Sequence, residues 1–173
     1  SDYISFSVSP LDGKSHKVQL YFSAAGNIAV NTPDEEITWQ RSTETGLDVM
    51  RTGTVAQNVL GRSGDDVRID WGYLYLVAPQ AKGLTTVMTS SQTSVNTFAN
   101  SGTLSMKDDA AQPRAAGTNP LTLAASYDLG SVSSTVDRHL ILAYDDIHSI
   151  EYFHQPLNAW WKRNGESTPH MHK

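Results

Sequence analysis

The first candidate for chemistry is a group of three charged side chains spaced two residues apart, Asp66, Arg68 and Asp70. On a β-strand this spacing places all three side chains on one face. Arg68 could then pair with either carboxylate, and the carboxylates could orient the hydroxyl groups of a bound ligand. Most ion pairs on strands are structural, so we expect a charged ladder on the surface of a sheet, with ligand binding as the alternative.

Aromatic side chains follow this charged group at the same spacing, at Trp71, Tyr73 and Tyr75. If strand geometry continues through Gly72, the rings lie on the face opposite the charges. An exposed row of rings would suit a sugar or another small polar molecule, whereas a buried row would belong to the core. We expect a core, and the burial of the rings distinguishes the two interpretations.

A second polar group lies near the end of the chain, where Asp145 and Asp146 are followed by His148 and Glu151. Three carboxylates and an imidazole could bind a divalent cation or serve as acid and base. The structural alternative is that Asp146 caps a helix while Asp145 closes a turn, because capping needs a single carboxylate. Asp145, Asp146 and Glu151 are therefore the candidate catalytic residues, with the structural interpretation preferred.

Motifs for other chemistries are missing from the sequence. It contains no Gly-x-Ser-x-Gly elbow, no phosphate-binding loop and no His-Glu-x-x-His pattern. His170 and His172 alone are too few for a zinc site, which normally needs three or four ligands. We therefore expect neither a metal nor a cofactor.

Composition narrows the class of partner. The 173 residues carry a formal net charge of -5, and the Lys and Arg residues are scattered singly. This argues against nucleic acid or an anionic membrane as the partner. The sequence has no cysteine and no run approaching the roughly 18 apolar residues of a transmembrane helix.

Short alternating runs bounded by Gly and Pro predict an all-β protein, an antiparallel β-sandwich. The first strand is expected over 3–9, and Asp12-Gly13 suits a tight turn leading to an antiparallel return over 17–22. Residues 101–120 are expected to form a long surface loop. Further strands are expected over 27–31, 36–41, 47–52, 67–77, 84–90, 94–99, 121–129 and 139–144.

The sequence changes character after Asp145. Apolar residues at helical offsets predict a short helical segment from Asp146 to Phe153. Pro156 either interrupts it or begins a second short helix that carries Leu157, Trp160 and Trp161. The domain organisation predicted is a sandwich over 1–146, a helical connector over 147–165 and a flexible tail over 166–173. Clustered aromatic residues favour an interface on the connector: Tyr152, Phe153, Trp160 and Trp161.

Three long runs together resemble the β domain of the glutaminase A family of secreted bacterial and fungal proteins. They are residues 18–22 with 29–34, residues 62–76, and residues 138–147 continuing to 161–165. The resemblance spans roughly residues 3–165. It implies a β-sandwich that precedes a domain of helical hairpins arranged like an α/α toroid, where the catalytic groups are expected. No catalytic residue of the family carries over to a position in this sequence.

The resemblance implies an extracellular or periplasmic protein whose longer parent hydrolyses L-glutamine to L-glutamate and ammonia. We therefore predict that this chain is a non-catalytic domain that packs against a downstream helical domain. The alternative is a carbohydrate-binding or glycoside-hydrolase-associated sandwich, in which a small polar substrate contacts Asp66, Arg68, Asp70, Trp71 and Tyr73. Exposed sheet edges also predict possible self-association.

Overall fold

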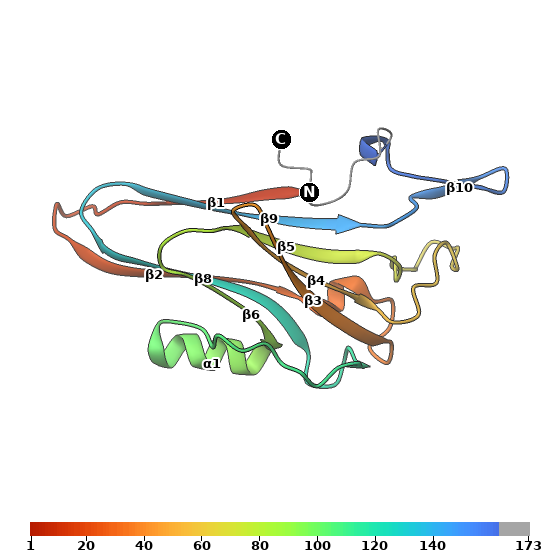
Figure 1. Cartoon of the computed structure of the whole chain (residues 1–173), viewed down its shortest axis with the longest axis horizontal. Coiled ribbons are helices and arrows are strands. Elements are labelled where there is room, and N and C mark those ends of the chain that lie inside the picture. The colour runs from red at the N-terminus through yellow and green to blue at the C-terminus, as the bar shows by residue number, and fades with distance from the viewer. Residues whose placement is uncertain (163–173) are drawn as a thin grey trace.

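The structure is a computed structural model that describes residues 1–162. Two antiparallel sheets pack face to face, which confirms the prediction of an all-β antiparallel sandwich (Figure 1). The six-stranded sheet has the order β1-β9-β5-β4-β3-β7, and the three-stranded sheet has the order β2-β8-β6. A separate hairpin, β10-β11, extends from one end of the sandwich.

The elements have the following bounds. The strands are β1 (Asp2–Val8), β2 (His16–Ala25), β3 (Glu36–Glu44), β4 (Leu47–Thr54), β5 (Tyr73–Pro79), β6 (Leu84–Ser90), β7 (Arg114–Ala115), β8 (Leu121–Val132), β9 (Val136–Asp145), β10 (Ile150–Tyr152) and β11 (Gln155–Leu157). The helices are η1 (Gly26–Ala29), α1 (Ser91–Ser101) and η2 (Trp160–Lys162). Among the helices within residues 1–162, none has the length and apolar character needed to cross a bilayer.

The main core lies between the two sheets and contains buried side chains from both, such as Leu76 of β5 and Tyr127 of β8. Removing side chains of this size from water contributes roughly 1.5–3 kcal/mol each. Helix α1 covers the other face of the three-stranded sheet (Figure 1). There the Phe98 and Tyr21 ring centroids lie 5.1 Å apart. The three-stranded sheet is therefore covered on both faces.

Strand β5 is also buried on both faces, which explains its nearly continuous apolar sequence. Leu74 and Leu76 face the main core. Tyr75 and Val77 belong to a second apolar cluster on the outer face of the six-stranded sheet, together with Ile141 of β9. This outer cluster keeps the middle of the six-stranded sheet largely dry on the side away from the other sheet.

The predicted hairpin between the first two strands is wrong. β1 pairs with β9, and β2 pairs with β8, so the turn at Asp12-Gly13 crosses from one sheet to the other. The reason is that the apolar faces of both strands pack on the same core, represented by Phe6 on β1 and Phe22 on β2. Strands whose apolar faces oppose each other across a core cannot also be hydrogen-bonded neighbours.

Two other predicted strands are helical. Residues 94–99 lie in α1, which Ser90 caps by accepting a hydrogen bond from Thr93 N at 3.1 Å and which ends at Gly102 with φ +71°. Residues 27–31 overlap η1, a short turn whose residues Gly26 and Ala29 are buried. Capping and burial outweigh the β propensity of the Thr and Val residues in these segments.

The predicted strand over 67–77 begins only at Tyr73. Gly72 adopts φ +88°, and a Cβ at that position would collide with the carbonyl oxygen of Asp145 on the neighbouring strand. The chain therefore turns at Gly72, where only glycine fits, instead of running straight into β5. Residues 67–70 are irregular as a result.

The helix predicted from Asp146 to Phe153 is wrong, because the structure has the β10-β11 hairpin there. A short helical segment does lie near the C-terminus, at η2. Phe153 and His154 at the tip of the hairpin have positive φ angles of 48° and 61°, and Pro156 lies opposite Glu151. Proline is tolerated on an isolated edge strand, where its missing donor costs no ladder hydrogen bond. Residues 163–173, with the predicted tail and the end of the predicted connector, lie outside the described residues.

Candidate functional site

The charged group of residues 62–70 forms a different ion pair from the one predicted. Asp70, 1% exposed, accepts a hydrogen bond from Arg62 Nε at 2.5 Å, and Arg62 Nη2 reaches Glu35 at 3.0 Å. Asp66 and Arg68 are both exposed in an irregular segment. The predicted one-sided ladder is therefore not formed, because its residues are not on a strand.

Turn residues 31–35 fasten this segment to the sandwich. Asn31 Oδ1 accepts a hydrogen bond from Arg68 N at 2.9 Å, while Glu35 accepts hydrogen bonds from the backbone of Asn31 and Thr32. Together with the Arg62 bridge to Glu35, these bonds hold residues 62–70 against the turn. Asp70 and Arg62 therefore have a structural role, which is to hold the segment in place.

The three aromatic rings do not form an exposed platform. Trp71 and Tyr75 are buried, and Trp71 Nε1 donates to the carbonyl oxygen of His148 at 3.1 Å. Tyr73 is half-buried, with its ring edge-on to Tyr75 at a centroid distance of 6.4 Å. Of the three rings, Tyr73 is the one that a ligand could reach.

Asp145 and Asp146 are engaged in local contacts. Asp145 forms an ion pair with Lys162 and accepts a hydrogen bond from Ile147 N at 3.1 Å. Asp146 accepts a hydrogen bond from Ser149 Oγ at 3.1 Å and caps no helix. Both carboxylates thus hold the chain as it leaves β9.

Glu151 shares no contact partner with Asp145 or Asp146 among the described residues. It is on β10 and pairs with His154 at the tip of the hairpin, at 3.3 Å. Within residues 1–162, no three His, Asp or Glu side chains are placed to hold a metal ion. The catalytic interpretation of Asp145, Asp146 and Glu151 stays a prediction.

The C-terminal hairpin, here residues 150–157, exposes large apolar side chains. Tyr152 is 61% exposed and Phe153 is 81% exposed, and their rings contact each other edge-on at a centroid distance of 4.6 Å. Trp160, in the turn that follows, is 78% exposed. The side chain of Trp161 lies outside the described part of the chain. Three of the four aromatic residues predicted to form an interface are therefore displayed on the surface.

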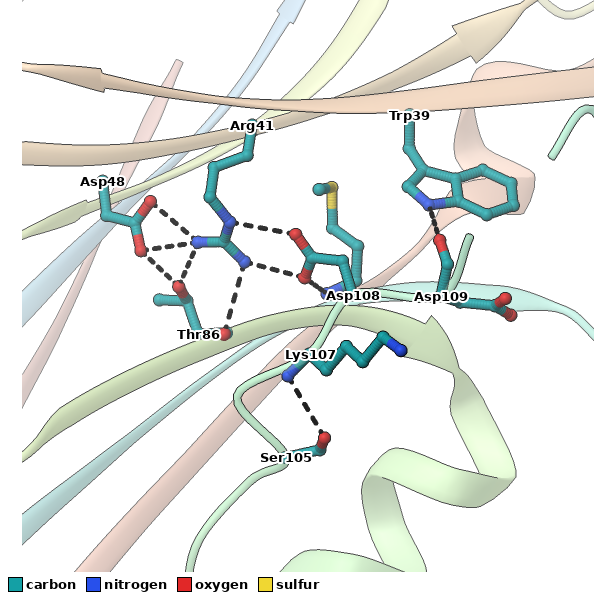
Figure 2. A network of polar contacts seen from close by, with 9 residues as sticks. Trp39, Arg41, Asp48, Thr86, Ser105, Lys107, Asp108 and Asp109 are labelled. Carbon is teal, nitrogen blue, oxygen red and sulfur yellow. Dashed lines mark hydrogen bonds and ion pairs between the residues drawn. The ribbon is translucent and has the colours of Figure 1, made fainter. Parts of the chain in front are cut away.

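A polar network around Arg41 joins the two sheets and a long loop (Figure 2). Arg41 Nη1 donates to both carboxylate oxygens of Asp48 at 2.8 and 2.7 Å, and Nε and Nη2 donate to Asp108 at 3.0 and 2.8 Å. Thr86 on β6 accepts from the guanidinium and donates to Asp48. Arg41 thereby links β3, β4, β6 and the loop over 102–113.

Electrostatics favour this network. Burial by itself would lower the pKa of the Arg41 guanidinium, but hydrogen bonds and charge from Asp108 and Asp48 outweigh burial and raise the pKa. Next to it, Trp39 Nε1 donates to the carbonyl oxygen of Asp109 at 2.8 Å (Figure 2). The side chain of Arg114 lowers the pKa of the Asp109 carboxyl through a hydrogen bond. The loop is thus fastened at two consecutive residues.

This fastened loop forms one wall of a pocket on the outer face of the six-stranded sheet. The pocket has a volume of about 440 Å³ and is lined by Thr38, Trp39, Gln40, Arg51, Tyr73 and Gln112. Sequence reasoning identified Tyr73 alone among these residues. The others carry no local signal, because β3, β4 and the loop are brought together by sheet pairing and by the Arg41 network.

The family model described as "Domain of unknown function (DUF5127)" matches residues 1–173. No curated protein matches the sequence.

Proposed function

This chain belongs to the DUF5127 family, and from its sequence resemblance to the glutaminase A family we propose that it is a non-catalytic β-sandwich domain of a larger, secreted, glutaminase-A-like amidohydrolase. In this proposal the parent hydrolyses L-glutamine to L-glutamate and ammonia in a downstream helical domain. The sandwich packs against that domain and supports it. The substrate and the secreted location rest on the sequence resemblance.

The observation that carries the docking role is the exposed aromatic surface of the C-terminal hairpin. Tyr152, Phe153 and Trp160 expose most of their surface close together in the chain. Large aromatic side chains left in water by one domain commonly become buried against another. Their position after the last strand of the sandwich favours a partner domain that follows in the same parent chain.

The proposed absence of catalysis is supported by the contacts of the candidate carboxylates. Asp145 is paired with Lys162, and Glu151 is paired with His154 on an exposed hairpin. Neither arrangement resembles an acid and a base facing a shared substrate position. The carbohydrate-binding alternative retains only Tyr73 as an accessible ring. Self-association through the free edges of β1 and β6 stays a prediction.

The test compares ammonia release from L-glutamine by this chain alone and by the full-length parent. We expect release by the parent only. In the parent, the double substitution Tyr152→Ser with Phe153→Ser should lower the thermal midpoint of the helical domain, because the docked rings are lost. The same substitutions should leave the midpoint of the isolated sandwich unchanged, since both side chains are exposed there.

Tyr3→Ser provides the matched control, because Tyr3 on β1 is also 61% exposed. This substitution should leave the parent unchanged. Ammonia release by the isolated chain would contradict the non-catalytic role. If the hairpin substitutions leave the thermal midpoint of the helical domain in the parent unchanged, docking through this surface is contradicted.

A further inference from the structure

The pocket on the outer face is built from three adjacent strands and one loop. Gln40 of β3 lies opposite Arg51 of β4, and Tyr73 begins the next strand, β5. Arg51 points away from the main core, which its neighbour Met50 faces. Gln112 closes the side where β3 has a free edge, since β7 pairs only with Glu36 and Ile37.

The orientation of the Gln112 side chain is fixed by its partners. Its Oε1 accepts a hydrogen bond from Trp39 N at 2.8 Å and another from Thr38 Oγ1 at 2.7 Å. A backbone N–H can only donate, so the atom that it meets must be the amide oxygen. The amide nitrogen of Gln112, with its two protons, therefore faces away from β3.

The orientation of the Gln40 side-chain amide is also fixed by its partner. Its Oε1 accepts a hydrogen bond from Arg51 Nη2 at 2.5 Å, and a guanidinium can only donate. Its amide nitrogen is therefore also left as a donor. Within residues 1–162, the Gln112 and Gln40 amide nitrogens form no hydrogen bonds with the protein.

Arg51 supplies the positive charge of the pocket. Its guanidinium lies over the Tyr73 ring at 4.5 Å from the centroid, which orients the planar group. Gly53 makes room for this ring, because a Cβ at that position would lie 2.8 Å from Tyr73 Cδ1. Apart from the bond to Gln40, the guanidinium forms no hydrogen bond within the described chain, so Nε and Nη1 keep protons for a ligand.

We propose that this pocket binds a small organic carboxylate. The lining residues present one guanidinium and two primary amide groups as donors, and none of them is Asp or Glu. A planar guanidinium matches the geometry of a carboxylate, and charge-assisted bonds of this kind are stronger than neutral ones. The volume of about 440 Å³ falls within the range of small-molecule sites. The proposal is independent of the docking role and of any glutaminase activity.

The test is a titration of the isotopically labelled protein with sodium succinate. The side-chain amide resonances of Gln40 and Gln112 report binding directly. Succinamide is the uncharged probe of the same shape, and sodium chloride matches the ionic strength. We expect saturable shifts of both resonances with succinate at millimolar concentrations and none with succinamide.

Two substitutions separate binding from folding. Gln112→Glu keeps an oxygen for Trp39 N and Thr38 but replaces the donor group with a negative oxygen, and Arg51→Gln removes the charge. Each should weaken succinate binding at least about tenfold, the effect of one charge-assisted bond. Gln80→Glu and Lys82→Gln make the same charge changes in the exposed turn between β5 and β6 and should have no effect.

Three results would overturn the proposal. These are equal shifts with succinamide, the absence of saturable shifts below about 10 mM succinate, and unchanged binding by folded Arg51→Gln and Gln112→Glu proteins. A failure here leaves the docking proposal untouched, because no residue of the C-terminal hairpin lines the pocket.

Discussion

Arg41 and Asp108 lie 67 residues apart in the chain, yet two parallel hydrogen bonds of 3.0 and 2.8 Å join them. Asp108 also accepts a hydrogen bond from Met88 N on β6, at 2.8 Å. One carboxylate thus ties a strand of each sheet to the loop over 102–113. The same loop carries Gln112 to the pocket, so the network that joins the two sheets also builds the pocket wall.

Asp108→Asn should lower the free energy of unfolding by about 1–3 kcal/mol, because Arg41 loses a charge-assisted partner in a partly buried site. The loop should also loosen at Asp109, which moves the indole N–H resonance of Trp39. Urea unfolding and the indole resonance measure the two effects. Asp65→Asn, at an exposed position, is the control and should change neither. Equal stability of both variants would show that the network does not hold the loop.

Several strands could be predicted from sequence, but their neighbours in the sheets could not. Alternation and β-branched residues located the strands now seen as β4 and β6, the latter with the same bounds. The turn at Asp12-Gly13 suggested a hairpin because local sequence describes how sharply a chain turns. Whether the chain returns to the same sheet depends on where the apolar faces of β1 and β2 are buried, which is a property of the whole core.

The candidate site shows the same limit at the level of side chains. The spacing of Asp70 from Arg68 predicted an ion pair only under strand geometry, and the turn at Gly72 removes that geometry. Arg62, eight residues away, becomes the partner instead. The pocket residues Gln40 and Arg51 become neighbours through the β3-β4 register. Sequence identified residue types able to bind or catalyse, but the register and the long loop determine which of them meet.

Tyr144 at the end of β9 holds the irregular segment before β5, because its hydroxyl donates to the carbonyl oxygens of Trp71 at 2.9 Å and Ile69 at 3.2 Å. Burial raises the pKa of this phenol, and the nearby carboxylate of Asp70 raises it further. The folded state therefore keeps its proton at a pH where the unfolded chain has lost it. The free energy of unfolding consequently falls as pH rises above the unfolded value of about 10.

Tyr144→Phe should cost about 1 kcal/mol near neutral pH, through the lost hydrogen bonds. The variant lacks the ionisable phenol, so its stability should fall less steeply above about pH 10, and the two curves should converge. Urea midpoints measured between about pH 8 and pH 11 test this. Tyr3→Phe alters an exposed phenol on β1. The curve of its urea midpoint against pH should run parallel to that of the unmodified protein. Parallel curves for Tyr144→Phe would rule out the linkage.

The ion pair between Asp145 and Lys162 closes the segment that carries the C-terminal hairpin. Both side chains are largely buried, at 13% and 14% exposed, and Lys162 also donates to the carbonyl oxygen of Ile147 at 3.3 Å. Replacing either partner removes a charge-assisted contact from a largely buried site, which is unfavourable. The segment can relieve this by opening into water, since the hairpin pairs with no strand of either sheet.

Lys162→Met should therefore loosen the hairpin without unfolding the sandwich. In hydrogen–deuterium exchange, peptides covering 146–162 should exchange at least about tenfold faster, while β5 and β9 keep their protection. Asp145→Asn should give the same local pattern, and Lys82→Met, an exposed lysine in the turn after β5, should give none. Loss of protection throughout β5 and β9 would instead mean that the pair supports the whole sandwich. In the proposed parent, a loosened hairpin would present Tyr152 and Phe153 in many orientations, so Lys162→Met should weaken docking even though it changes no side chain of the hairpin.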